Sequence, residues 1–206
     1  MRKLILLATL ITIAAPLYAQ QYEPWRFHFG LGYPFPTGTT SDAAEGVFRL
    51  GLGAIKPLRP QLGLRMDAEW DRFDPTQKIV DAYEAEGGYA NIWSGNIGLQ
   101  YDLKPMGSAG INSYFFGQLG THYKQAYLTN PGVGWYCDPW WGICYPVGVD
   151  VIDAKKTDTA FGANVGFGLG WPMMHGTEFY VELKYQWVNG DAANIDYVPI
   201  MIGWRW

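Results

Sequence analysis

The chain ends in Tyr197-Val198-Pro199-Ile200-Met201-Ile202-Gly203-Trp204-Arg205-Trp206, and this stretch decides the fold. Every second position carries a large apolar side chain: Val198, Ile200, Ile202, Trp204 and Trp206. A period of two is typical of a β-strand with one apolar face. In water such a strand would be an aggregation hazard through that face and its unpaired edges. We therefore expect the apolar face to meet lipid, with the edges paired by closure into a membrane barrel.

The N-terminus has the features of a secretory signal peptide. Arg2 and Lys3 precede an apolar run from Leu4 to Leu17, and Ala19 completes a plausible cleavage site. We therefore expect residues 1–19 to be a cleaved signal peptide and residues 20–206 to form one barrel domain. Without residues 1–19 the chain has 13 Lys and Arg against 19 Asp and Glu, a net charge of −6. This acidic balance argues against a nucleic-acid partner.

Seven further segments alternate in the same way, so the sequence predicts eight strands in all. No apolar run after Gln20 is long enough for a membrane helix. The predicted strands are Trp25–Tyr33, Val47–Ala54, Leu62–Phe73, Ile92–Leu103, Tyr114–Tyr127, Phe161–Trp171, Phe179–Trp187 and 197–206. The connections between them alternate between short and long, and the longest covers residues 128–160. That alternation is typical of an outer-membrane barrel with short periplasmic turns and longer extracellular loops.

A secreted soluble β-protein, with the apolar faces packed into a core, is the alternative. It is disfavoured because the polar faces carry many glycines, which suits a crowded barrel interior better than an exposed surface. Aromatic residues near the predicted strand ends also favour the membrane barrel, since interfacial girdles lie there.

The inward faces of the predicted barrel carry balanced charges. An eight-stranded barrel is just wide enough for its own side chains, so we expect a filled lumen and no porin channel. The inward set by parity is Arg26, Arg49, Arg65, Lys184 and Arg205 with Asp67, Glu69, Asp71, Asp102 and Glu182. If the turn at residues 55–61 centres near Leu58, Arg49 lies opposite Asp67, and we expect these two to pair. The network is interpreted as structural filling; a gate or plug is the functional alternative.

Two inward residues invite a search for catalysis. Ser94 and His122 fall on neighbouring predicted strands, with Glu69 or Asp71 one strand further on, which is the composition of a nucleophile, base and orienting acid. All of these side chains point into the lumen, whereas an enzyme acting on membrane lipid needs an accessible nucleophile. We therefore expect an interior hydrogen-bond network and no enzyme. No closely spaced metal-ligand set is present in the sequence, and no cofactor is expected.

The longest predicted loop contains both cysteines of the chain, Cys137 and Cys144. In an exported protein a disulfide is the natural expectation, with metal binding as the weaker alternative. The same segment carries five large aromatic residues: Trp135, Tyr136, Trp140, Trp141 and Tyr145. Rigid aromatic side chains are favoured as binding anchors, so this segment is a candidate surface-contact site. The alternative is that the rings pack on one another or enter the lipopolysaccharide interface.

The whole pattern resembles the small OmpA/OmpX-like outer-membrane β-barrels. The resemblance rests on the signal peptide, the eight amphipathic segments and the aromatic C-terminus. It implies that Trp204 and Trp206 belong to the signal recognised by the barrel-assembly machinery, although the family usually ends in Phe. It also implies a monomer in the outer membrane, in contact with lipid and lipopolysaccharide, with a structural or adhesin-like role towards a host or envelope ligand. A lipid-modifying enzyme and a carrier of small hydrophobic molecules are the alternatives.

Overall fold

The computed structural model describes residues 24–82, 86–137, 144–173, 176–190 and 194–206, with the backbone alone for residues 131–137 and 144–154. The predicted signal peptide lies outside these residues. The described part forms eight strands: β1 (Arg26–Thr37), β2 (Ala44–Arg59), β3 (Leu62–Pro75), β4 (Gly87–Asp102), β5 (Asn112–Cys137), β6 (Cys144–Pro172), β7 (Glu178–Val188) and β8 (Ile195–Arg205). Two short helices, η2 (Gly38–Thr40) and α2 (Gln77–Ala82), lie in the connections.

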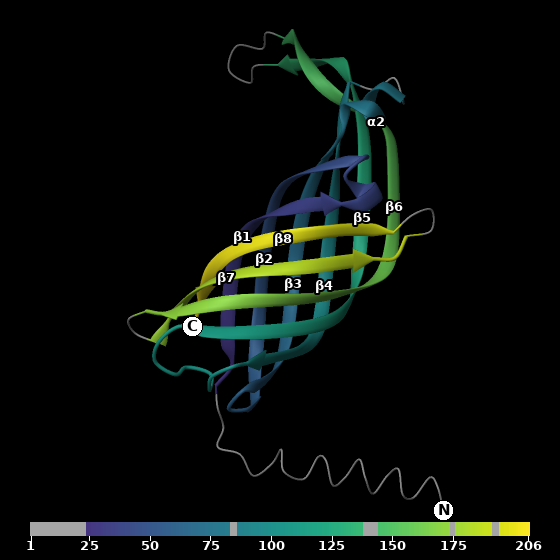
Figure 1. Ribbon diagram of the computed structural model, residues 1–206. Helices are drawn as coiled ribbons and strands as arrows, with labels where there is room; N and C mark the ends of the chain where they lie inside the picture. Colours follow the sequence, from purple (N-terminus) through teal and green to yellow (C-terminus); the bar gives the residue numbers. More distant parts are fainter. Residues whose placement is uncertain (1–23, 83–85, 138–143, 174–175, 191–193) are drawn as a thin grey trace, which may run out of the picture.

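The eight strands form one closed antiparallel barrel in which each strand pairs with its neighbours in the sequence (Figure 1). The seam is made by β1 and β8, where Leu31 lies opposite Ile202. Beyond the seam, Phe27 and Trp206 exchange two backbone hydrogen bonds of 2.9 Å, which join the two ends of the barrel wall. Closure leaves no free edge in the barrel wall, so the predicted up-and-down barrel is confirmed.

The alternation in β8 has the predicted direction. Ile200, Ile202 and Trp204 are exposed on the outside, while Met201, Gly203 and Arg205 are buried inside. The other strands follow the same rule, which gives the barrel an apolar outer surface and a polar interior. A surface of this kind is stable only against hydrocarbon, so the outside of the barrel is its membrane face. No helix in the described ranges is long and apolar enough to cross a membrane.

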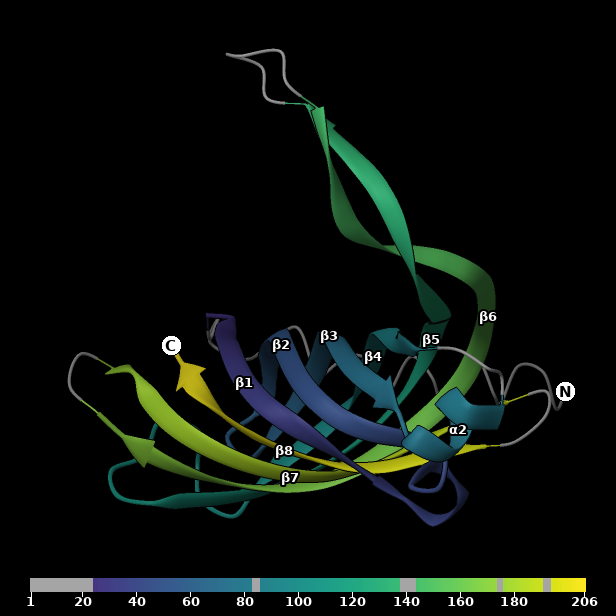
Figure 2. The same cartoon turned by 90° about the horizontal axis from the view of Figure 1, so that it is seen from above.

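The connection of residues 128–160 differs from its prediction as a long loop. β5 and β6 continue through most of it as paired strands, up to Cys137 opposite Cys144. The pairing has a bulge at Leu128 and Thr129, where β6 contains one extra residue. Bulges bend and twist a strand pair. From there the hairpin projects away from the barrel rim (Figures 1 and 2).

The two ends of the barrel differ. One end has the hairpin β5–β6, the helix α2 and the connection from β7 to β8. The other end has the turn between Arg59 and Leu62, two further connections, and the C-terminus. Because barrels of this class keep short turns in the periplasm and larger loops outside the cell, the hairpin end is the extracellular end.

Candidate functional site

The centre of the lumen is built around Arg65 on β3, whose side chain is fully buried. Its two terminal nitrogens donate to the two carboxylate oxygens of Glu182, at 2.7 and 2.9 Å. Its Nε donates to Asp67 at 2.8 Å, and its guanidinium lies 4.1 Å from the ring centre of Phe116. Asp67 also contacts His28 Nε2 at 3.1 Å. The contact of Arg65 with both oxygens of Glu182 is the two-pronged geometry that makes arginine–carboxylate pairs strong.

A second cluster lies nearer the extracellular end, around Arg49 on β2. Arg49 contacts both oxygens of Asp71, at 2.6 and 2.8 Å, and Glu69 at 2.5 Å. Glu69 in turn binds Lys184, and Tyr197 donates from its hydroxyl to Asp71 at 2.9 Å. The cluster therefore joins β2, β3, β7 and β8 across the lumen.

The predicted pairing of Arg49 with Asp67 is wrong. The register places Asp71 opposite Arg49, and Asp67 opposite Gly53. The turn centres near Pro60 and Gln61 instead of Leu58, because β2 extends to Arg59 with an irregularity after Pro57. Both registers keep Arg49 facing the lumen, so alternation alone does not distinguish them.

A third cluster occupies the periplasmic end. Glu178 accepts from Arg26 at 2.6 Å and from Arg205 at 3.3 Å. Arg205 lies between two rings, with its guanidinium 4.6 Å from the ring centre of Tyr114 and 5.3 Å from that of Tyr180. Glu178 was missed by the sequence analysis because it precedes the predicted start of its strand, although it shares the parity of the inward residues Tyr180 and Glu182.

The remaining predicted lumen residue, Asp102, is held by hydrogen bonds from uncharged groups. Its two carboxylate oxygens accept from the side-chain amides of Gln100, at 2.9 Å, and Asn112, at 2.6 Å. No ion pair of Asp102 is found within the described part of the chain. All ten predicted charges thus lie in the interior, and nine of them make ion pairs.

The extracellular end of the lumen is closed by apolar side chains. Phe73, Ile92, Val188 and Tyr197 pack together from four different strands, and Phe73 meets Tyr197 edge to face at 5.3 Å. These rings lie directly above the Arg49 cluster, to which Tyr197 is hydrogen-bonded. A polar solute entering from outside would meet an apolar plug and then a set of neutralised charges. The arrangement favours a filled barrel over a conducting one.

Ser94 and His122 lie opposite each other, as the sequence suggested, with Ser94 Oγ 2.7 Å from His122 Nδ1. The second ring nitrogen of His122 faces the Gln186 amide at 3.4 Å. The nearest predicted acid, Glu69, is engaged with Arg49, Lys184 and Asn96. Ser94 is 6 % exposed and His122 is fully buried. Among the described residues no carboxylate contacts His122 in the way that a hydrolytic triad requires, and the serine of the pair is buried. Within the described residues no group of three metal-ligand side chains is found.

The projecting hairpin is the other candidate site. Towards the extracellular end, the outermost residue of β5 that pairs with β4 is Thr129, and the outermost residue of β6 that pairs with β7 is Gly162. Residues 130–137 of β5 therefore extend about 26 Å beyond the wall, at about 3.3 Å per residue. The register sets Cys137 opposite Cys144, and cross-strand neighbours have Cα separations that a disulfide can bridge. The disulfide itself stays a prediction. Trp135, Tyr136 and Tyr145 lie on paired strands, while Trp140 and Trp141 fall outside the described residues.

Comparison with solved structures places this chain among the small outer-membrane β-barrels. Neisserial surface protein A is similar with a TM-score of 0.59 and 12% identity, covering 90% of this chain and 98% of that protein. A major outer membrane protein from Thermus thermophilus has a TM-score of 0.56 and 11% identity, covering 89% and 99%. OprG from Pseudomonas aeruginosa has a TM-score of 0.51 and 13% identity, covering 88% and 93%.

No protein-family model and no curated protein matches the sequence. At the identities found, the structural likeness shows the fold, and it confirms the predicted OmpA/OmpX-like architecture. With its apolar outer face and its charged, filled interior, the protein is an outer-membrane β-barrel.

Proposed function

We propose that this protein is a non-enzymatic surface-contact protein, in which the barrel is a closed anchor and the hairpin β5–β6 presents an adhesive tip. The observation that carries the proposal is the hairpin itself. The hairpin continues beyond Thr129, where the pairing of β5 with β4 stops, and beyond Gly162, where the pairing of β6 with β7 stops. It projects from the extracellular end (Figure 2). A projection of this length has no role in closing the barrel.

The interior supports the same conclusion by disfavouring transport. The carrier alternative requires an apolar cavity, but the lumen holds three charge clusters around Arg49, Arg65 and Arg205. An apolar plug closes its outer end. Lipid hydrolysis is disfavoured by the burial of Ser94 and His122. The surface outside the membrane is therefore where a function is best sought.

The sequence of the tip supports a contact role. Trp135, Tyr136, Trp140, Trp141 and Tyr145 fall within eleven consecutive residues, next to the two cysteines. Trp and Tyr are the residue types most enriched at binding hot spots, because they bring large contact area at little entropic cost. A disulfide between Cys137 and Cys144 would hold the tip and reduce that cost further.

Adhesion of whole cells tests the proposal. A non-adherent Gram-negative strain that displays the protein is expected to bind epithelial monolayers more than the same strain without it. A variant in which residues 131–150 are replaced by Asn-Gly keeps the Asn130 and Val151 pair and gives a two-residue turn. It should lose the added adhesion while keeping heat-modifiable migration, the mark of a folded barrel.

A second variant separates chemistry from length. Trp135, Trp140 and Trp141 changed together to Ser should reduce adhesion, whereas the same residues changed to Phe should retain most of it. Adhesion that is unaffected by removal of the hairpin would refute the proposal. So would a displayed wild-type protein that adds no adhesion at all.

A further inference from the structure

The membrane face of the barrel has a hollow whose floor is made of small residues. Ala68 on β3, Gly95 on β4 and Thr121 on β5 lie side by side in register, and all three are exposed. A Cβ added to Gly95 would meet no atom within 4 Å. We call this hollow of about 290 Å³ the outer notch. Its volume is at the lower end of the range for small-molecule pockets.

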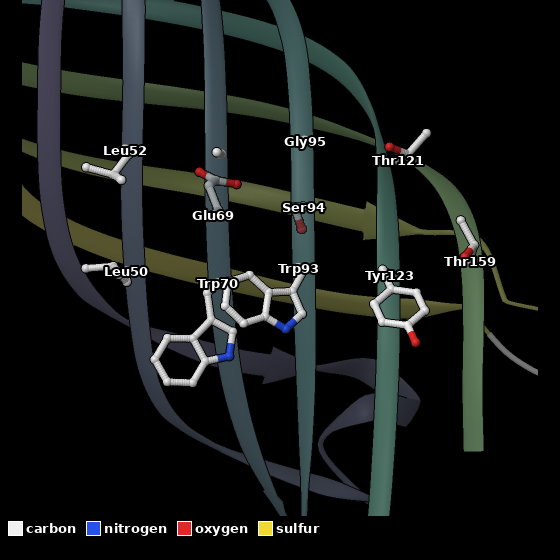
Figure 3. A pocket seen from close by; sticks show the side chains of 11 residues that line it. Leu50, Leu52, Glu69, Trp70, Trp93, Ser94, Gly95, Thr121, Tyr123 and Thr159 are labelled. Atoms are coloured by element: carbon white, nitrogen blue, oxygen red, sulfur yellow. The ribbon is translucent and has the colours of Figure 1, made fainter. Parts of the chain in front are cut away.

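Large apolar side chains surround the outer notch. Leu52 and Phe161 flank it in the same row, and both are about half exposed. Towards the extracellular end stand the rings of Trp70 and Trp93, stacked with their centres 5.6 Å apart. Figure 3 shows these rings beside the notch, with Leu50 and Leu52 on one side and Thr121 and Tyr123 on the other. Trp70 Nε1 donates to Asn91 at 3.0 Å, which fixes the ring.

A row of cations and tyrosines crosses the same strands nearer the extracellular end. The Arg72 guanidinium lies 4.7 Å from the ring centre of Tyr89, Tyr89 stacks on Tyr127 at 4.6 Å, and Lys155 Nζ lies 5.3 Å from the Tyr127 ring centre. We call these four residues the cation–tyrosine row. Arg72 meets its ion-pair partner Asp74 only at 3.9 Å, with 40% of the Arg72 side chain exposed. Such an exposed pair is weak and leaves the guanidinium open to an anion.

A second hollow lies at the cation–tyrosine row. It measures about 400 Å³ and opens at the extracellular rim of the wall. Tyr89, Tyr127 and Lys155 line it, together with Ala44 and Ala90, which pack on the apolar plug of the lumen, and Ile79 of α2. Positive side chains beside aromatic faces suit a phosphorylated sugar headgroup, since the ammonium and guanidinium groups bind phosphate and the rings stack on the sugar.

The distance between the cation–tyrosine row and the outer notch matches the length of one lipid acyl chain. Tyr89 and Gly95 are six residues apart on β4, about 20 Å along the strand and about 15 Å in depth at a tilt of about 40°. One leaflet of the hydrocarbon core is also about 15 Å thick. A chain that starts below the cation–tyrosine row therefore passes the tryptophans and reaches the outer notch without leaving its own leaflet.

We infer that the outer notch holds an acyl chain of one lipid A molecule, whose phosphates bind Arg72 and Lys155 of the cation–tyrosine row. The occupant follows from the extracellular position of the cation–tyrosine row, because the leaflet there is lipopolysaccharide, and from the positive charges of Arg72 and Lys155. The site lies apart from the adhesive tip and is tested by lipid retention and not by adhesion, so the failure of one proposal is distinguishable from the failure of the other.

Retention of lipid through purification tests the site. The full-length mature protein is extracted from outer membranes in mild detergent, washed by detergent exchange, and its bound lipid is quantified by native mass spectrometry. We expect the wild type to keep about one lipid A per barrel. Gly95→Leu fills the outer notch and should lower this retention at least fivefold, and Arg72→Gln with Lys155→Gln should do the same.

Matched variants control for general effects. Gly117→Leu adds the same side chain at another outward glycine, where an added Cβ meets its nearest atoms at 3.9 Å. Arg59→Gln with Lys104→Gln removes two exposed charges at the periplasmic end. Both controls should retain lipid A as the wild type does, and heat-modifiable migration reports folding of every variant.

Three results would overturn the inference. Equal retention in all variants would mean that lipid A is held only as general boundary lipid. If Gly117→Leu lowers lipid A retention as much as Gly95→Leu does, the outer notch is not the site that holds the lipid. Phospholipid retained in place of lipid A, in a manner that depends on Gly95, would show that the hollow has a different occupant.

Discussion

Replacing Arg65 with Met removes the central cation of the lumen and keeps an unbranched apolar chain in place of the arginine methylenes. Arg65→Met leaves Glu182 without its two-pronged partner, with only a longer contact to Arg205 at 3.5 Å and the hydroxyl of Tyr114, and it takes from Asp67 the Nε donor at 2.8 Å. Removing one member of a buried ion pair costs about 3–5 kcal/mol, because the remaining charge stays buried without compensation. At about 1.4 kcal/mol per factor of ten, the equilibrium constant for folding should decrease by a factor of about 100 to about 4,000.

Urea unfolding of the barrel refolded in detergent micelles, followed by tryptophan fluorescence, measures this cost. Arg72→Met is the matched control, because Arg72 lies on the same strand, faces outward and makes only a loose pair; its cost should stay below about 1 kcal/mol. Adding Glu182→Gln to Arg65→Met removes one uncompensated charge and should recover at least about 1 kcal/mol. The reasoning is refuted if Arg65→Met lies within about 1 kcal/mol of the wild type, well under the cost of an uncompensated buried charge.

Three further predictions concern the seam, the serine and the cysteines. Gly203→Ala would press a Cβ against the backbone oxygen of Phe29, so the compact form on gels should decrease, while Gly95→Ala should leave it unchanged. Ser94→Ala should leave the lipid profile of the outer membrane unchanged, and any altered acylated lipid would instead support an enzyme. Cys137 and Cys144 should resist alkylation until a reductant is added, and free thiols in the protein isolated from outer membranes would contradict the disulfide.

The period-two pattern predicted which side of the wall each residue faces. Arg65, Glu182 and Arg205 all proved to be inward because a strand side chain can point to only two sides. The same pattern could not place partners along the strand. Moving the turn centre from Leu58 to the Pro60–Gln61 region shifts the partners of residues 48–57 by four and leaves each side chain on the same side of the wall. The pairing of Arg49 therefore depended on the turn, where Pro57 and Pro60 obscure the pattern.

Apolar residues inside the lumen were also missed by the sequence analysis. Phe73, Ile92 and Tyr197 close the extracellular end, and Ile55 is fully buried towards the other end. These residues lie on the same alternate positions of their strands as the inward charged residues. A search of the lumen for polar residues alone does not identify them. Their position is physically reasonable because neutralised charges leave little need for water around them.

Residues 128–160 were predicted as a loop, and the hairpin within them contains Pro131, Gly132, Gly134 and Pro146. Such residues interrupt strands in most contexts. Here the two strands pair only with each other beyond the barrel wall, so a proline can face an unpaired edge without removing a wall hydrogen bond. The prolines and glycines are therefore compatible with a long hairpin outside the wall, which the strand pattern did not predict.

The bulge at Leu128 and Thr129 connects the two proposed surfaces. At this point the hairpin loses contact with β4, and only its lower part is held by neighbouring strands. Leu128 and Lys155, on the two strands of the hairpin base, both line the second hollow beside the cation–tyrosine row. A lipid A molecule whose phosphates bind Arg72 and Lys155 would tie β3 to β6 across that base, and would restrain the hairpin where the wall no longer does. The direction of an adhesive tip would then depend on the lipid beneath it, so Arg72→Gln with Lys155→Gln should lower adhesion even though neither residue lies at the tip.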